Sequence, residues 1–414
     1  MKKSLGIILL VIMIMLYCGC GAAKDGAAPE MAHLSLEDIE DNGSYSMERS
    51  AAFGRTEASQ ETPPAEQIQQ EPLIYVTFSQ HSDSVNADDG TKLFISQSYI
   101  PSFVSEDETV NHWISSAVDT AVLETAEELH SMEQQAWSDY QSRAGDESLD
   151  FYAYSYYSNV SSARLDNSVV SVLQVNSVYS GGTHPNYAQK AYNLDLVNCT
   201  ELGLTDVILP GGAEFLHRQV LERLEDRFGG LEHSGLYADY PQIVTSYFED
   251  PDLTPNWYFS ENGLVIYFNC YDIAPYAAGI IKVEFPYDAL TGVLKPEFYP
   301  ETVMAGPGEL IALDSADGRR VLGTSAEGEC TIVGTEQTIY DVKLHRLAGW
   351  LTDDVPMTGQ MVLAANRLTA EEALAIPLGE GFGYLVTYSS DGGLVRKMVF
   401  DSSGTQEIVD EIAE

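Results

Sequence analysis

The sequence predicts an α+β fold: an antiparallel sheet with packed helices in a central module, followed by a small β-rich C-terminal domain. Three observations support this prediction. Strand-like runs flank a tight turn between residues 256 and 287, apolar residues recur at helical spacing in two other stretches, and residues 306–414 alternate short apolar runs with turn sequences. Antiparallel strands with separate helices are typical of this class.

An aromatic hairpin is the strongest local signal. Residues 256–260 and 264–268 are rich in aromatic and β-branched side chains, and the Asn262-Gly263 pair between them tolerates the positive φ of a tight turn. Residues 280–287 then alternate apolar with charged side chains, so one face of this run is apolar. These stretches predict three strands, the last of them half-buried.

Further strands and helices are predicted upstream. Alternating or β-branched runs predict strands over residues 74–78, 92–99, 151–160, 168–179 and 192–196. Ser105 and Glu108 have the spacing of a capping box, and the apolar residues that follow predict a helix to about Tyr140. A second amphipathic helix is predicted over residues 214–228 and a short one over 242–248.

Residues 306–414 are predicted to form a separate β-rich domain of unknown role. Hairpin turns are predicted at 316–318 and 390–393, the latter between strands over 383–388 and 394–400. Thr369 and Glu372 have the spacing of a capping box and predict a short helix through Ile376.

Residues 1–20 are predicted to be a lipoprotein signal peptide. Lysines precede an apolar run over residues 5–17, which is shorter than the roughly 20 apolar residues of a membrane-spanning helix. The sequence before Cys20 resembles a bacterial lipobox, in which the cysteine after a glycine is acylated, so Cys20 is the expected lipid anchor. An ordinary cleaved signal peptide is the alternative. Residues 21–72 are rich in Ala, Glu, Ser, Gln and Pro and predict a disordered acidic tether.

The chain is strongly acidic, with a formal net charge of −42 from 63 acidic and 21 basic residues. Phosphate recognition needs clustered Lys and Arg, so nucleic-acid binding is not expected. A cationic partner, or simple solubility outside the cell, fits this charge. Cys199, Cys270 and Cys330 match no zinc spacing and allow one disulfide without requiring it; small buried thiols are the favoured interpretation.

Two loops are predicted to form a binding surface. Residues 180–186 combine two glycines with a proline, which predicts a sharply turned loop that exposes its side chains; the alternative is that the glycines serve only the turn. Residues 271–279 carry tyrosines of the kind that anchor interfaces, unless these pack under the sheet. The candidate ligand-binding residues are Ser180, Gly181, Gly182, His184, Tyr271, Pro275 and Tyr276.

Several motifs occur in a recognisable order: VYSGGTHPN, YNLDL, NWYFSENGLVIYF, YDIAPYAAG and VEFPYDAL. Together they resemble the paired extracytoplasmic RsiV-like module of the lysozyme-sensing anti-sigma factor of bacilli. A similar module precedes the catalytic domain of some peptidoglycan deacetylases. YIPSF before VNHWISSAV resembles the N-terminal half of the same module. The resemblance covers about residues 71–301, with the halves at 73–189 and 190–301.

The resemblance implies an α+β fold and binding of lysozyme through exposed loops, with Ser180, Pro275 and Tyr276 at the positions most like that binding surface. The chain departs from the anti-sigma factor because its sequence shows no cytoplasmic sigma-binding segment and no transmembrane helix. Signalling across the membrane by this chain alone is therefore not expected. No run of Asp and His at metal-ligand spacing follows residue 301, so a deacetylase domain is not expected either.

The sequence favours a binding protein over an enzyme. It contains no Gly-x-Ser-x-Gly elbow, HExxH helix, Walker loop or dinucleotide fingerprint, and no cofactor or metal is expected. His184 with Asp195 or Asp272 is the nearest approach to a catalytic pair, and a hydrolase is the least favoured alternative. We expect a protein anchored by lipid on the extracytoplasmic face of a Gram-positive-like bacterial membrane. Its expected role is to capture or sense a lysozyme-like cationic wall hydrolase; the alternative ligand is peptidoglycan.

Overall fold

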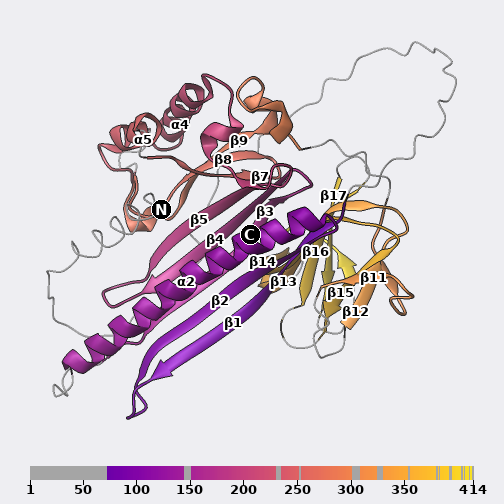
Figure 1. The fold of residues 1–414 in the computed structure, drawn as a ribbon, viewed down its shortest axis with the longest axis horizontal. Helices are drawn as coiled ribbons and strands as arrows, with labels where there is room; N and C mark the ends of the chain where they lie inside the picture. Colours follow the sequence, from indigo (N-terminus) through magenta and orange to yellow (C-terminus); the bar gives the residue numbers. More distant parts are fainter. Residues whose placement is uncertain are drawn as a thin grey trace. The chain divides into compact units, whose positions relative to one another are not determined.

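The largest sheet of the protein contains strands from both ends of the described chain (Figure 1). The computed structural model describes residues 72–143, 151–229, 235–250, 253–300, 308–323, 330–352, 355–378, 381, 383–390, 394–401, 404, 406–409 and 411–412. Within these residues the sheet has 11 strands in the order β18-β17-β16-β13-β14-β1-β2-β3-β4-β5-β6. The predicted signal peptide, its acylation site Cys20 and the tether up to residue 71 lie outside the described residues.

This large sheet is antiparallel at every junction but one. Its strands are β1 (Ile74–Asn86), β2 (Lys92–Ser105), β3 (Tyr154–Leu165), β4 (Val169–Tyr179), β5 (Asn186–Asp195), β6 (Thr200–Glu201), β13 (Ile339–Thr352), β14 (Val355–Leu368), β16 (Tyr384–Ser390), β17 (Leu394–Phe400) and β18 (Gln406–Ile408). β2 and β3 are parallel, because the 36-residue helix α2 carries the chain back between them.

Helix α2 (Glu108–Arg143) confirms the long predicted helix and lies along one face of the large sheet (Figure 1). The capping box predicted for it is wrong in detail. Asp107 accepts the N–H of Thr109 at 2.8 Å and that of Val110 at 3.1 Å, whereas Ser105 accepts the N–H of Asp107. A carboxylate at this end of a helix also interacts favourably with the helix dipole, which favours Asp107 over Ser105 as the cap.

A three-stranded sheet, in the order β7-β8-β9, packs against the opposite face of β3 to β5. Its strands are β7 (Asn256–Ser260), β8 (Gly263–Phe268) and β9 (Ile281–Pro286), which confirms the predicted hairpin and third strand. Helices α3 (Leu204–Val207), α4 (Gly212–Phe228) and α5 (Tyr240–Glu249) share one core with this small sheet. Short 3-10 helices follow at Tyr276–Ala278, Tyr287–Leu290 and Pro296–Phe298.

The turn of the β7–β8 hairpin differs from the expectation. Glu261 and Asn262 join the strands, and neither Asn262 nor Gly263 has a positive φ. A Cβ on Gly263 would lie 1.9 Å from the carbonyl oxygen of Phe285 on β9. The close approach of β9, and not the turn conformation, is therefore what requires glycine at this position.

The region predicted as a C-terminal domain shares the large sheet with the N-terminal strands. β14 pairs with β1, with Tyr75 opposite Ala365. A four-stranded sheet packs against the C-terminal strands of the large sheet, around a core that includes Leu344, Leu374 and Phe400. Its strands, in the order β10-β12-β15-β11, are β10 (Ile311–Leu313), β12 (Cys330–Gly334), β15 (Glu372–Pro377) and β11 (Arg320–Leu322). The predicted fold class is confirmed, and the domain boundaries stay a prediction.

The helix predicted after Thr369 is wrong, because Glu372–Pro377 forms strand β15. One of the two capping contacts is present, since the N–H of Thr369 donates to Glu372 Oε2 at 2.7 Å. The Thr369 hydroxyl donates to the same oxygen, whereas the N–H of Glu372 donates to the carbonyl oxygen of Thr369. The strand is buried between β11 and β12, with Leu374 and Ile376 fully inaccessible. Burial on both faces removes the alternation that would have marked this strand in the sequence.

The predicted C-terminal turns have different outcomes. At residues 316–318 the turn is formed, with positive φ at Asp317 and Gly318. It connects β10 to β11, which lie at opposite edges of the four-stranded sheet, so the predicted hairpin is wrong. The hairpin of β16 and β17 is confirmed by the pairing of Ser390 with Leu394. Its turn, residues 391–393, lies outside the described residues.

The cysteines of the described residues are free, and the expectation that they are buried is wrong. Cys199 and Cys270 are partly exposed and Cys330 is exposed. Cys199 adopts a φ of 52° in the turn after β5, where its thiol contacts the carbonyl oxygen of Leu196. None of the helices in the described part of the chain combines the length and the hydropathy that a membrane crossing requires.

Candidate functional site

The two loops predicted to form a binding surface meet in the structure. The ring of His184, from the first loop, stacks on the ring of Tyr276, from the second, with centroids 4.1 Å apart and an interplanar angle of 26°. The hydroxyl of Tyr271 lies 3.3 Å from His184 Nε2. Tyr187 of β5 adds a ring 6.0 Å from that of Tyr276. We call His184, Tyr187, Tyr271 and Tyr276 the aromatic surface.

The aromatic surface faces solvent. Tyr187 is 44% exposed and Tyr271 is 48% exposed, and Pro275 is exposed beside them. Tyr276 is partly buried, because its ring lies among those of His184, Tyr187 and Tyr271. The alternative that Tyr271 packs under the sheet is therefore wrong. Aromatic rings held against one another lose little side-chain entropy on binding, which suits them to contact a ligand.

Backbone conformation explains the glycines of the first loop. Gly181 has a φ of 91° and Gly182 a φ of 111°, and both are exposed, as is Ser180 before them. A Cβ on either glycine would meet no atom closer than 3.7 Å, so conformation and not space requires glycine there. The hydroxyl of Tyr179 donates to the carbonyl oxygen of Gly182 at 3.2 Å, which holds the turn against the end of β4.

The hydrogen bonds of His184 define its tautomer. Its Nδ1 lies 2.9 Å from the carbonyl oxygen of Pro185, which only accepts, so Nδ1 carries the proton. In the neutral ring Nε2 then accepts from the hydroxyl of Tyr271. The histidine therefore links the two loops through a hydrogen bond as well as through its stack on Tyr276.

Asn269 fastens the second loop to the large sheet. Its side chain imitates a neighbouring strand, since Asn269 Oδ1 accepts the N–H of Gln189 at 2.7 Å and Asn269 Nδ2 donates to the carbonyl oxygen of Gln189 at 3.1 Å. The Tyr267 hydroxyl donates to the same carbonyl oxygen at 3.2 Å. These contacts place the loop beside β5, which begins immediately after the first loop.

The second loop also holds a strained residue. Tyr271 has a φ of 72°, a conformation that costs a non-glycine residue on the order of 1 kcal/mol or more. The N–H of Tyr271 donates to the carbonyl oxygen of Ala274 at 3.1 Å, and the carboxylate of Asp272 accepts the N–H of Asn269 at 2.7 Å. Burial raises the pKa of Asp272 and that of the Cys270 thiol.

The catalytic pair considered from the sequence is not formed among the described residues. The ring nitrogens of His184 contact Pro185 and Tyr271, whereas the carboxylate of Asp272 is bonded within its own loop. Asp195 is buried and accepts the N–H groups of the turn that follows β5. The described residues also contain no group of His, Cys, Asp and Glu that could hold a metal ion.

Some residues of this face were missed from the sequence. Tyr157 of β3 is 42% exposed and lies opposite Ser177 of β4, which in turn lies opposite Tyr187 of β5. All three side chains therefore share one face of the sheet. The sequence analysis started the strand at residue 192, and the alternation that would have identified Tyr187 begins six residues earlier, at Asn186.

A polar cavity of about 790 Å³ was also missed. Its lining residues come from strands distant in sequence and from the turn between β7 and β8, and include Asn159, Ser161, Glu261, Asp341, Lys343 and His345. Partial desolvation in the cavity and repulsion from Glu261 raise the pKa of Asp341 to about 6, and burial lowers the pKa of His345 to about 4. Lys343 forms an ion pair with Glu261. Neither His184 nor Tyr276 lines this cavity.

Part of the chain matches a family of unknown function. Residues 206–288 match the model described as "Protein of unknown function (DUF3298)". This stretch contains α4, α5, the small sheet and the second loop, but not the first loop at 180–186. None of the curated proteins matches the chain.

Solved structures that match the chain include two from bacteria. A DUF3298 family member from Bacteroides fragilis is 19% identical, with a TM-score of 0.43, and the match covers 54% of this chain and 94% of that chain. A DUF3298 family protein from Pseudomonas aeruginosa is 16% identical, with a TM-score of 0.38, and the match covers 55% of this chain and 96% of that chain.

Proposed function

We propose that the protein is a lipid-anchored extracytoplasmic binding protein that captures or senses a cationic wall hydrolase of the lysozyme type through its aromatic surface. The observation that carries this proposal is the meeting of the two loops, which presents exposed tyrosines supported by a stacked histidine. Tyrosines anchored in this way are typical hot spots of protein interfaces. The resemblance to the lysozyme-sensing module implies the same loops, through Ser180, Pro275 and Tyr276.

The charge of the chain supports a cationic partner. With a formal net charge of −42, the protein attracts a basic protein over distances beyond direct contact. This attraction acts mainly on the association rate and weakens as salt shortens the Debye length to about 8 Å at physiological ionic strength. Capture by charge steering therefore predicts slower association at higher salt, while contacts made by the tyrosine rings act mainly on dissociation.

Peptidoglycan glycan is the second candidate ligand, with the protein positioning another component at the cell wall. The observation that favours it is the exposed pair Tyr157 and Tyr187 on one sheet face, with Ser177 between them. Flat rings along a sheet offer stacking surfaces to sugar rings. Such contacts depend little on ionic strength, so the salt response separates this ligand from a cationic protein.

The experiment measures binding of a basic lysozyme to residues 69–414, which form one compact unit. We expect Tyr276→Ala to weaken binding at least tenfold, since a truncated interface anchor costs about 2 kcal/mol or more. Tyr152→Ala is the matched control: Tyr152 is 56% exposed, and among the described residues its ring packs against none of the aromatic surface.

The outcomes separate the two ligands. Binding to lysozyme that slows with added salt and is lost in Tyr276→Ala supports capture of a cationic hydrolase. Retention on purified peptidoglycan that is insensitive to salt and is lost in Tyr157→Ala supports the glycan. Absence of both interactions would contradict the assignment of a wall-related ligand to the aromatic surface.

A further inference from the structure

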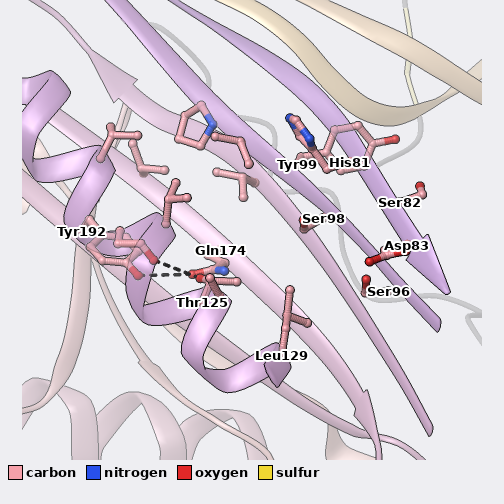
Figure 2. A pocket seen from close by; sticks show the side chains of 18 of the residues that line it. His81, Ser82, Asp83, Ser96, Ser98, Tyr99, Thr125, Leu129, Gln174 and Tyr192 are labelled. Atoms are coloured by element: carbon pink, nitrogen blue, oxygen red, sulfur yellow. Dashed lines mark hydrogen bonds between the residues drawn. The ribbon is translucent and has the colours of Figure 1, made fainter. Parts of the chain in front are cut away.

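Helix α2 is buried against the large sheet at two places and spans a cleft between them. Its buried residues are Ile114, near its start, and Met132 and Ala136, toward its end. The side chains at 115–131 are all partly or fully exposed. Ile114 belongs to one hydrophobic core and Met132 to another, so the two contacts are separate. The cleft between helix and sheet has a volume of about 530 Å³ (Figure 2).

The lining of this cleft is largely apolar. The helix side includes small and β-branched side chains such as Ala117, Ala121 and Val122, and the sheet contributes larger ones such as Phe103 and Leu194. Larger side chains at the alanine positions would fill the space, so the helix sequence keeps the cleft open. A cavity of this size with a largely apolar surface is typical of a site for a small molecule.

Two polar side chains of the cleft lining, Gln174 and Tyr192, are already paired. The hydroxyl of Tyr192 donates to Gln174 Oε1 at 3.2 Å, and Gln174 Nε2 donates to the hydroxyl of Ser158 at 3.1 Å. Figure 2 shows Gln174 and Tyr192 close to each other and to Thr125 of the helix. Because the hydrogen-bonding capacity of these side chains is already used, an apolar part of a ligand can lie beside them.

Charge is confined to one end of the cleft and is negative. Among the described residues that line it, Asp83 and Glu133 are the acidic ones, His81 and His130 accompany them, and no Lys or Arg is present. Glu133 directly follows Met132, and Asp83 lies opposite Ser96 near the start of β2, so both belong to the end of the cleft near the second core. A cationic group is favoured at this end and an anionic group is disfavoured.

We propose that the cleft under α2 binds a single-chain amphiphile with a cationic head group. The apolar chain lies between the helix and the sheet, where it replaces water against apolar side chains. The head group lies beside Asp83, which is exposed, and Glu133, which is partly exposed. This site is distinct from the aromatic surface, none of whose rings lines the cleft, and the inference does not rest on the proposed function.

The test compares amphiphiles of one chain length by isothermal titration calorimetry below their micelle concentrations. The probes are dodecyltrimethylammonium, dodecyl maltoside and dodecanoate, which carry cationic, neutral and anionic head groups. We expect saturable binding with one site per chain and an affinity for the cationic probe at least tenfold above that for the anionic probe. The double variant Asp83→Asn, Glu133→Gln should remove this preference and retain binding of the neutral probe.

A cavity-filling variant tests the location. Ala121→Phe should weaken binding of every probe at least tenfold, whereas Thr120→Phe, exposed on the same helix and outside the cleft lining, should bind as the unchanged protein does. Hydrogen exchange on the unchanged protein gives a readout that requires no variant: the cationic probe should protect amides of residues 117–129. Equal affinity for all head groups, unchanged binding in Ala121→Phe or absence of protection at 117–129 would overturn the proposal.

Discussion

At the scale of single residues, the buried Arg164 joins β3 to the small-sheet layer. It is 2% exposed, its Nε lies 2.6 Å from Asp166 Oδ2, and Nη1 donates to the carbonyl oxygen of Phe298 at 2.6 Å and to the Tyr287 hydroxyl at 2.8 Å. Its guanidinium also lies over the ring of Phe259. Burial of Asp166 opposes ionisation, but the Arg164 guanidinium favours the ionised form and lowers the pKa of Asp166 below its ordinary value.

Removing the guanidinium of Arg164 should destabilise the folded protein. We expect Arg164→Met to lower the free energy of unfolding by about 3–5 kcal/mol, because it leaves Asp166 without its cation and breaks the contacts to residues after β9. Urea denaturation measures the change. Arg218→Met is the matched control, since its 4.0 Å pair with Glu222 is exposed and should contribute less than about 1 kcal/mol. Equal losses in the two variants would contradict the role assigned to Arg164.

Two residues of the polar cavity should affect acid stability in opposite directions. The folded-state pKa of His345, about 4, lies below its ordinary value of 6.5, so the unfolded chain takes up the proton first and stability falls as pH drops from 6.5 to 4. The folded-state pKa of Asp341, about 6, lies above its ordinary value of 3.8, so its protonation adds stability as pH drops from 6 to 4.

Substitutions should therefore separate these effects. His345→Gln should reduce the loss of unfolding free energy between pH 7 and pH 4.5 by up to about 2 kcal/mol. Asp341→Asn should increase that loss by a smaller amount, because the side chain of Asp341 keeps contact with solvent. Urea denaturation at the two pH values measures both. Identical pH dependence in the unchanged protein and both variants would contradict the shifted pKa values.

The residues of the aromatic surface were partly predictable. His184, Tyr271 and Tyr276 stood out because glycine, proline and tyrosine cluster in short loops, which is a local signal. Asn269 did not, because its function is to pair with the backbone of Gln189, 80 residues earlier in the chain. A side chain that replaces a strand partner leaves no pattern in the sequence around it.

At the scale of elements, the position of the second loop depends on the side-chain amide of Asn269. We expect Asn269→Ala to destabilise the protein by about 1–3 kcal/mol, because the N–H of Gln189 loses its acceptor. It should also weaken ligand binding by the aromatic surface about as much as Tyr276→Ala does, since Tyr271 and Tyr276 are then no longer held beside His184. Asn198→Ala is the control, an asparagine whose amide donates only within the turn after β5.

Two measurements check this expectation. Hydrogen exchange should speed up at amides of 271–279 in Asn269→Ala and not in Asn198→Ala. Binding assays on the same samples then relate the loop to the ligand. Full binding by Asn269→Ala with an unchanged exchange rate would show that the contacts to Gln189 do not position the loop.

Elements were predicted well where apolar periodicity was long and poorly where a cap was the main signal. The repeats that predicted α2 and α4 extend over several turns, and in α4 the apolar face is buried in a core. For residues 369–376 the spacing of Thr369 and Glu372 was the main helix signal. The residues that follow pair with β11 on one side and with β12 on the other. Glu372 itself pairs with Arg367 at 3.2 Å. Tertiary pairing therefore overrides a signal that spans a few residues.

At the scale of the whole molecule, the pairing of β1 with β14 could not be predicted. The N–H of Ile74 donates to the side chain of Asn366 at 3.1 Å, across a separation of 292 residues, and Leu73 is buried in the C-terminal core. Hydrophobic patterns identify strands but not their partners, and each strand here is compatible with several neighbours. The sequence therefore predicts a domain boundary between 301 and 306, while strands from before and after it belong to the same large sheet.

A truncation tests whether this shared sheet governs stability. A fragment of residues 69–301 lacks β14, so Tyr75, Val76 and Thr77 keep their partners on β2 but lose those on β14, and Leu73 loses its core. An unpaired, largely apolar edge promotes association with other chains. We expect the fragment to unfold at least about 3 kcal/mol more easily than residues 69–414, since burial of Leu73 is lost and the core around Val76 loses Met361 and Ala364, and to self-associate on size-exclusion chromatography. A monomeric fragment with the unfolding free energy of residues 69–414 would instead support a C-terminal domain that folds separately, as the turn-rich sequence of 306–414 predicts.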